Sequence, residues 1–248
     1  MNFLKNPGLP EAEISAAAVS ATYPAFTAGL AMLGIHAIKI RSQSRLAESV
    51  KNHADTVCFY AGNGMVYVGA GETLLKNKFL QEGFHAEEIS EPVCSPYPHD
   101  TLLNALLLGK RLFANRKNLA SELIDCCNAY GIKIIPVKQG YAKCSCAVVD
   151  KDSIITADAG IAKAAELEGI QVLRIRPGYI RLSGCGYGFI GGTCGKIARD
   201  KLAFAGRIQD HPDFPNIKGF LGQRGIYPVV LADKPLSDIG GIIPLMYR

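Results

Sequence analysis

Hydrophobic and polar positions along the chain follow a pattern that recurs about five times. The clearest copy lies within Cys144–Ile175. Two runs rich in β-branched and small apolar residues flank the polar turn Asp150-Lys-Asp152, which suits a hairpin. Apolar residues at helical spacing follow, with Asp158 as the expected N-cap and Gly169 as the stop, and residues 170–175 form a third strand. The pattern predicts a unit of strand, hairpin, strand, helix and strand.

Three further segments repeat this order, and the pieces of a fifth lie at the two ends of the chain. The expected inner strands of the other complete copies are Asp55–Ala61, Asp100–Leu108 and Tyr187–Cys194. The divided copy combines a strand at Asp238–Ile243 with a helix near Ala25–Leu33 and a strand at Ile35–Ile40. Because missing a repeat means misreading the whole fold, this repetition is the main evidence for the architecture. We expect one domain over residues 1–248, with its fifth unit closed by the N- and C-terminal segments.

The composition favours a soluble protein in a reducing compartment. With 248 residues, 48% of them hydrophobic, the chain can bury a full core. Its first ten residues lack the apolar stretch of a secretory signal. The run from Ile14 to Ile38 has no Asp, Glu, Lys or Arg, but its small residues and internal Pro24 favour a buried strand and helix over a membrane span. We therefore expect a cytoplasmic protein without a membrane contact.

The eight cysteines indicate neither a disulfide framework nor a metal site. Cys126 and Cys127 are adjacent, and Cys144 and Cys146 are separated by one residue, which is poor spacing for a set of disulfides. No Cys-x-x-Cys occurs, so the strongest zinc signature is absent. We expect free cysteines and no bound metal.

Positive charge is concentrated in one stretch of a chain whose net charge is +5. Between Arg174 and Arg207 there are seven basic residues and one acidic residue. This stretch is consistent with a solvated face, or with a site for an anion such as phosphate, carboxylate or RNA. The sequence leaves both interpretations open.

Five ββαβ units, with the last assembled from both chain ends, resemble the pentein fold of the guanidino-group modifying superfamily. That superfamily includes amidinotransferases, arginine deiminases and dimethylarginine dimethylaminohydrolases, and also a non-enzymatic ribosome anti-association factor. The resemblance covers repeat order and hairpin position along nearly the whole chain. It implies a five-bladed α/β propeller of ββαβ units around a pseudo-fivefold axis, and it leaves the activity open because one fold hosts unrelated functions. A plain α/β sandwich is the alternative fold.

Polar residues that interrupt the apolar pattern near the starts of the inner strands are the candidate site residues. In a ring of such units these strand starts would meet at one mouth of a central cleft. The candidates are His53 and Asp55; His99, Asp100 and Asn104; Lys143 and Cys144; Arg181 and Cys185; and Asp238. Each also has a local explanation, such as ending a loop or satisfying backbone groups.

The resemblance implies a catalytic set that this chain lacks in part. Enzymes of the superfamily attack a guanidinium carbon with a cysteine thiolate near the C-terminus, while a histidine moves protons and two carboxylates hold the cation. The comparable segment here, Asp238–Met246, contains no cysteine. We therefore expect a non-catalytic or degenerate member that binds a small molecule or a macromolecule in its central cleft. The small molecule would be a guanidino compound or an anion, and RNA or the ribosome is a less strongly indicated partner. The alternative is an amidinotransferase-like or amidinohydrolase-like enzyme with Cys144 or Cys185 as a relocated nucleophile and His99, next to Asp100, as acid and base.

A glycine-rich segment completes the predicted site. Gly186–Gly191 matches the letters of a dinucleotide-binding fingerprint but does not lead from a strand into a helix, and Gly191–Lys196 is one residue short of a P-loop. We expect no nucleotide cofactor and no other cofactor. Glycines in an inner strand leave room for a ligand. The predicted ligand-binding residues are Asp55, Asn104, Arg181, Gly191, Gly192 and Asp238.

Overall fold

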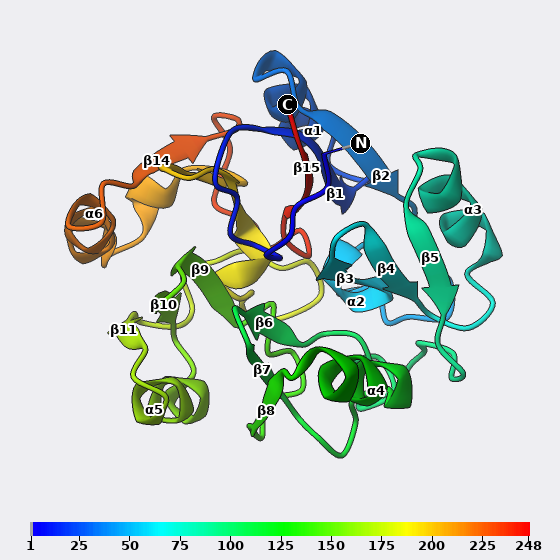
Figure 1. Cartoon of the computed structure of the whole chain (residues 1–248). Coiled ribbons are helices and arrows are strands. Elements are labelled where there is room, and N and C mark those ends of the chain that lie inside the picture. Colours follow the sequence, from blue (N-terminus) through cyan, green and yellow to red (C-terminus); the bar gives the residue numbers. More distant parts are fainter. Residues whose placement is uncertain (1) are drawn as a thin grey trace.

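Five three-stranded sheets surround a common centre in the computed structural model of the chain, which describes residues 2–248 (Figure 1). In each sheet the inner strand pairs antiparallel with the middle strand, and the middle strand pairs parallel with the outer one. A helix connects the middle and outer strands and lies on the periphery of the ring. The fold therefore consists of five ββαβ units, as the repeat pattern predicts.

Four units follow one another along the chain. The first unit consists of β3 (Cys58–Gly62), β4 (Met65–Val68), α3 (Thr73–Gln81) and β5 (His85–Glu88), and the second of β6 (Leu106–Leu108), β7 (Arg111–Ala114), α4 (Ser121–Tyr130) and β8 (Lys133–Pro136). The third unit consists of β9 (Cys146–Asp150), β10 (Ser153–Thr156), α5 (Ala159–Leu167) and β11 (Gln171–Arg174). The fourth consists of β12 (Cys194–Ala198), β13 (Lys201–Phe204), α6 (Phe214–Gly222) and β14 (Tyr227–Val230). A single helical turn, α2 (Ala54–Val57), precedes β3. Short 3-10 turns lie at Gly191–Thr193 and Ile208–Asp210.

The remaining unit joins the two ends of the chain. Its inner strand is β15 (Ile243–Tyr247), which pairs antiparallel with β1 (Ile14–Ser20), and β1 pairs parallel with β2 (His36–Ile40). Helix α1 (Pro24–Met32) connects β1 and β2. The long uncharged run of the sequence therefore forms β1, α1 and part of β2. Nowhere in residues 2–248 is there a helix with the length and apolar character needed to cross a membrane.

The third unit shows how local sequence specifies the local fold. Asp150 Oδ1 accepts a hydrogen bond from the backbone N–H of Asp152 at 2.8 Å, which closes the hairpin turn. Asp158 Oδ1 accepts from the N–H of Ile161 at 2.8 Å and caps α5. Gly169 adopts φ +76° directly after the helix, a conformation that suits glycine. The predicted cap, turn and stop of this unit are all present.

Four inner strands begin later than the apolar pattern predicts. Residues 55–57 belong to the turn α2, and β6 covers only the last three residues of the expected strand Asp100–Leu108. The expected strand Tyr187–Cys194 is wrong, since β12 begins at Cys194. The expected strand Asp238–Ile243 is also wrong, because β15 begins at Ile243 and Gly240 and Gly241 both have φ +76°, which a β-strand does not accommodate.

The two mouths of the ring differ. At the mouth formed by the hairpin turns, the N-terminal segment before β1 crosses the centre (Figure 1). It is held there by backbone hydrogen bonds from Leu4 N–H to Leu245 O at 2.9 Å and from Asn63 N–H to Leu4 O at 2.8 Å. The loops that lead into the inner strands form the other mouth. Between the two ends, residues of the inner strands and the N-terminal segment enclose a cavity of about 60 Å³, which Asp55, Lys143 and Lys196 also line.

Candidate functional site

Polar side chains from four of the loops that lead into inner strands meet at the mouth opposite the N-terminal segment. Asp55 precedes β3, Asn104 precedes β6, Cys144 precedes β9 and Asp238 precedes β15. All four side chains are buried. Each loop ends where its inner strand begins, so the arrangement of the five units brings these residues together. We call this group, with His53 and Lys143, the polar cluster.

Asn104 ties three of these loops together. Its side-chain oxygen accepts hydrogen bonds from the backbone N–H groups of Lys143 at 3.0 Å and Cys144 at 3.2 Å. Its side-chain nitrogen donates to the backbone oxygen of Asp55 at 3.0 Å and lies 3.3 Å from Cys144 Sγ. These bonds replace strand pairing in the segment before β6, which explains why the expected strand is short.

The Cys144 thiol faces the carboxylate of Asp55. The Sγ atom donates to Asp55, with 3.1 Å to Oδ1 and 3.0 Å to Oδ2, and both residues are 2% exposed. Burial and the neighbouring carboxylate raise the pKa of the Cys144 thiol well above its usual value. Burial also raises the pKa of Asp55. The thiol is therefore protonated at neutral pH and acts as a hydrogen-bond donor.

Asp238 is positioned by backbone groups of two glycine-rich segments. Its Oδ2 accepts from Phe189 N–H at 2.8 Å, and its Oδ1 accepts from Gly240 N–H at 3.1 Å. A side chain on Gly192 would overlap both Oδ1 and Oδ2 of Asp238. Asp238 is 1% exposed. Gly192 is needed here because only a residue without Cβ allows the carboxylate to approach this closely.

His53 and Lys143 complete the polar cluster. His53 is 2% exposed, its Nε2 lies 3.7 Å from Asp238 Oδ1, and neither ring nitrogen has a hydrogen-bond partner. Lys143 Nζ donates to Gly191 O at 3.2 Å and lies 4.0 Å from Asp55 Oδ2. Ligand atoms of His53, Cys144 and Asp238 all lie within 4.8 Å of one another.

An open cleft of about 590 Å³ lies directly beside the polar cluster, with Asp238 among its lining residues. Tyr23 and Tyr179 contribute aromatic walls, and Arg181 and Cys185 are exposed within it. The cleft thus has a cationic side chain on its wall and a carboxylate at its inner boundary.

A family model described as "Family of unknown function (DUF6873)" matches residues 18–243. The chain belongs to this family. No curated protein matches the DUF6873 chain in sequence.

Solved structures with the same arrangement include an amidinotransferase, a deiminase and a dimethylaminohydrolase. The inosamine-phosphate amidinotransferase of Streptomyces griseus aligns with a TM-score of 0.59 and 10% identity over 100% of this chain and 97% of its own. The agmatine deiminase of C. jejuni aligns with a TM-score of 0.59 and 9% identity over 98% of this chain and 96% of its own. A cysteine-to-serine mutant of the dimethylarginine dimethylaminohydrolase of Pseudomonas aeruginosa, complexed with citrulline, aligns with a TM-score of 0.57 and 10% identity over 93% and 96%. At such low identity the likeness shows the pentein fold of the DUF6873 protein, and the predicted resemblance is confirmed.

The structure places the predicted catalytic residues in three different environments. Cys144 lies in the polar cluster, whereas Cys185 lies in the open cleft and is exposed. His99 is exposed, and Asp100 accepts a hydrogen bond from the hydroxyl of Tyr141 at 2.6 Å. Among the described residues, no hydrogen bond joins His99 or Asp100 to Cys144. The histidine that does lie beside Cys144 is His53.

The predicted ligand-binding residues fall into two groups. Asp55, Asn104, Gly191, Gly192 and Asp238 all belong to the polar cluster or to the backbone around it. Arg181 lies in the cleft beside them and contacts the loop before β15 through a backbone bridge to Ser237. Tyr141 is a neighbour of the cluster that the sequence pattern did not indicate, because nothing distinguishes it from other tyrosines of the chain.

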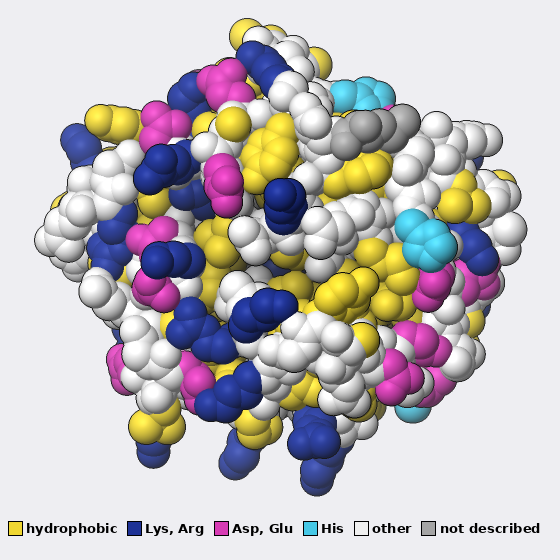
Figure 2. Space-filling view, in the orientation of Figure 1, with side chains coloured by type: hydrophobic (Ala, Val, Ile, Leu, Met, Phe, Trp, Pro, Cys, Tyr) yellow, Lys and Arg dark blue, Asp and Glu magenta, His cyan; other side chains and the backbone are white. Residues whose placement is uncertain are grey.

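The basic stretch from Arg174 to Arg207 is divided among different surroundings. Arg176 pairs with Asp213 at 2.8 Å, Lys201 with Glu13 at 2.8 Å, and Arg207 with Asp210 and Asp233, each at 2.8 Å. On the face with the hairpin turns, Lys and Arg side chains alternate with Asp and Glu (Figure 2). The charge excess of the stretch is thus partly neutralised by acids elsewhere in the chain. An RNA-binding or ribosome-binding surface there stays a prediction.

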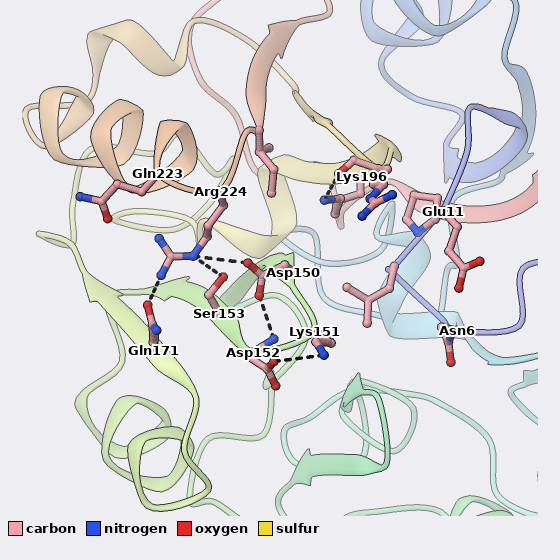
Figure 3. Close-up of a pocket in the computed structure, with 14 residues that line it drawn as sticks. Asn6, Glu11, Asp150, Lys151, Asp152, Ser153, Gln171, Lys196, Gln223 and Arg224 are labelled. Atoms are coloured by element: carbon pink, nitrogen blue, oxygen red, sulfur yellow. Dashed lines mark hydrogen bonds and ion pairs between the residues drawn. The ribbon is translucent and has the colours of Figure 1, made fainter.

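A second open cleft, of about 760 Å³, lies at the hairpin-turn mouth between the third and fourth units and the N-terminal segment (Figure 3). Arg224 points into it and donates to Ser153 Oγ at 2.8 Å and to the side chain of Gln171. Lys196 lies at its inner end and is 4% exposed. In this cleft Arg224 pairs with Asp150, Lys151 pairs with Asp152, and Lys196 donates to backbone oxygens, so we assign the candidate site to the opposite mouth.

Proposed function

We propose that this DUF6873 protein is a non-catalytic pentein that binds a small molecule in the cleft beside Asp238. The proposal rests on the absence, among residues 2–248, of an exposed, reactive cysteine at the starts of the inner strands. The loop and strand from Asp238 to Met246 contain no cysteine, and Cys144 is buried with its thiol donating to Asp55. A thiol whose pKa is raised holds almost no thiolate at neutral pH and is a poor nucleophile.

The cleft supports a ligand with an anionic and a cationic end. The exposed guanidinium of Arg181 suits a carboxylate, which it can hold through two parallel hydrogen bonds. Asp238 lies at the inner boundary of the cleft with 1% of its surface exposed, and its negative charge favours a ligand whose inner end is an ammonium or guanidinium group. The structural neighbours include a complex with citrulline and an agmatine deiminase, so arginine-like molecules are the first probes.

Calorimetric titration with arginine and with agmatine tests this proposal, because the two differ by the carboxylate. We expect arginine to bind about 10- to 100-fold more tightly, in line with a charge-assisted hydrogen bond of roughly 1.5–3 kcal/mol. Arg181→Ala should reduce the affinity for arginine to that for agmatine. Arg174→Ala, an exposed arginine outside the cleft, is the matched control and should leave both affinities unchanged. Absence of binding by either compound, or an unchanged preference in Arg181→Ala, would contradict the proposal.

The alternative is an enzyme that uses Cys144 as a relocated nucleophile. The specific observation in its favour is that His53, Cys144 and Asp238 present their ligand atoms within 4.8 Å of one another. Alkylation at neutral pH followed by peptide mapping separates the two functions. A binding protein should be labelled first at the exposed Cys185, and Cys144 should react slowly. Fast labelling of Cys144 that arginine suppresses, or turnover of arginine, would establish the enzyme.

We also propose that the protein works in a reducing compartment such as the cytoplasm. All eight cysteines are free, and six of them are buried. Buried free thiols without partners are typical of proteins that are not exposed to oxidising conditions. Mass spectrometry of the protein taken directly from cells into an alkylating buffer would show whether all eight are reduced.

A further inference from the structure

We propose that His53, Cys144 and Asp238 form a buried binding site for a divalent transition metal ion, with zinc the best match to the donors. The three residues supply one imidazole nitrogen, one sulfur and one carboxylate oxygen. This is a zinc donor set of the kind found in proteins. The inference reverses the expectation drawn from the missing Cys-x-x-Cys motif, and it does not require the small-molecule ligand proposed above.

The spacing of the donor atoms is close to what the ion needs. Ligand atoms of His53, Cys144 and Asp238 all lie within 4.8 Å of one another. Zinc bonds of about 2.0–2.3 Å in a tetrahedron place donors roughly 3.3–3.8 Å apart. The 3.7 Å between His53 Nε2 and Asp238 Oδ1 already matches, and the distances to Cys144 Sγ have to shorten by at most about 1.5 Å. Asp55 lies outside this set of mutually close atoms, but its carboxylate oxygens lie 3.0 and 3.1 Å from Cys144 Sγ, so it borders the site as a second carboxylate.

His53 is the independent observation that points to a missing partner. Its side chain is 2% exposed, and neither Nδ1 nor Nε2 makes a hydrogen bond. Buried polar groups in folded proteins are nearly always paired, since an unpaired one destabilises the fold. The Nε2 atom lies 3.7 Å from Asp238 Oδ1, so it is directed into the cluster. A metal ion between the two would give the Nε2 atom of His53 a partner.

The charge balance of the polar cluster also favours a cation. Asp55 and Asp238 are both almost fully buried, and among residues 2–248 the ammonium group paired with either is Lys143 Nζ, 4.0 Å from Asp55. When the ion binds, the Cys144 S–H bond breaks, a sulfur–metal bond forms and the proton leaves to the solvent. The bound site then contains two carboxylates, one thiolate and a divalent ion beside Lys143.

The surrounding bonds hold the ligands in place. Asp238 is fixed by the N–H groups of Phe189 and Gly240, and the Cys144 loop is fixed by Asn104. Such outer contacts orient metal ligands and are part of most metal sites. His53 precedes the buried turn α2, so its backbone is also held by the fold.

Titration of the chelator-treated protein with Co²⁺ tests the site, because a cobalt–thiolate bond gives an intense near-ultraviolet band. We expect this band in the wild type at one Co²⁺ per chain, and its displacement by one equivalent of Zn²⁺. Cys144→Ser should abolish the band, and His53→Gln should lower the Co²⁺ affinity at least tenfold. Cys146→Ala is the matched control, because Cys146 is equally buried two residues away and lies outside the cluster. It should keep the band.

A wild type that shows no thiolate band, or a band that survives in Cys144→Ser, would overturn the metal site. The wild-type result decides the question even where a variant fails to fold. The titrations contain no guanidino compound, and the arginine titrations are run with chelator present. Failure of one proposal is therefore distinguishable from failure of the other.

Discussion

Lys196 is a buried lysine whose replacement should change how the stability of the protein depends on pH. It lies in β12, is 4% exposed, and donates to Val149 O at 2.8 Å and to Arg199 O at 2.6 Å (Figure 3). Burial lowers its pKa from the usual 10.5 to about 8. The perturbation is Lys196→Met, which keeps the length of the side chain and removes the titrating group.

The sign and size of the effect follow from the two pKa values. Between about pH 8 and 10.5 the unfolded chain still holds the proton that the folded chain has released, so raising the pH stabilises the fold. Each pKa unit corresponds to about 1.4 kcal/mol. From about pH 7 to about pH 10, the wild type should gain roughly 2–3 kcal/mol of unfolding free energy relative to Lys196→Met.

Urea unfolding at several pH values, read by circular dichroism, measures this difference. The comparison with the variant cancels the opposite effect of the buried cysteines and tyrosines, whose raised pKa values destabilise the fold at alkaline pH. Lys151→Met is the matched control, because Lys151 lines the same cleft with its side chain 83% exposed. A difference between wild type and Lys196→Met that stays constant with pH would refute the reasoning.

Three further predictions concern the fold. Deleting residues 243–248 removes β15 and uncovers the edge of β1, so the truncated chain should be insoluble, and a soluble chain with an unchanged thermal midpoint would contradict the pairing of the two ends. Gly192→Ala should lower the unfolding free energy by roughly 2–3 kcal/mol, because the added methyl group overlaps Asp238. Gly219→Ala is the control, at an exposed position in α6 with no atom nearby, and it should raise the unfolding free energy by roughly 0.5–1 kcal/mol. Equal effects of the two substitutions in urea unfolding would argue against the close approach of Gly192 to Asp238. Asp158→Ala removes the cap of α5 and should lower the thermal midpoint through a loss of about 1 kcal/mol of unfolding free energy. An unchanged midpoint would show that the cap hydrogen bond is not formed.

The sequence predicted the repeat and most helices because these depend on local periodicity. In the third unit, the hairpin turn, the cap at Asp158 and the stop at Gly169 agree with the structure. The starts of the inner strands were predicted too early because apolar composition there does not reflect backbone pairing. Around Asn104 and Asp238, backbone groups bond to buried side chains instead of to a neighbouring strand. Local rules failed where the candidate site lies, as is expected of functional regions.

The convergence of the polar cluster could be predicted because repeat geometry brings the inner strand starts to one mouth. The sequence could not show which histidine lies beside Cys144. His53 stands two residues before Asp55 and His99 one residue before Asp100, so neither pattern is distinctive. Only the turn α2 and its packing bury His53, and this depends on contacts with the distant loop at Gly240. Whether the cluster binds a ligand stays a prediction.

The pairing of β15 with β1 has a consequence for the order in which the blades form during synthesis. Ser15 Oγ donates to the backbone oxygen of Tyr247, 232 residues later, so the segment made first acquires its inner strand only after the four other units have been translated. Those four are contiguous and can each fold on emerging. Until then β1 presents an open edge, which is a hazard for aggregation and a binding site for chaperones. A circular permutant opened between β2 and α2, with the present ends joined, would make all five blades contiguous and should refold faster and with less aggregation.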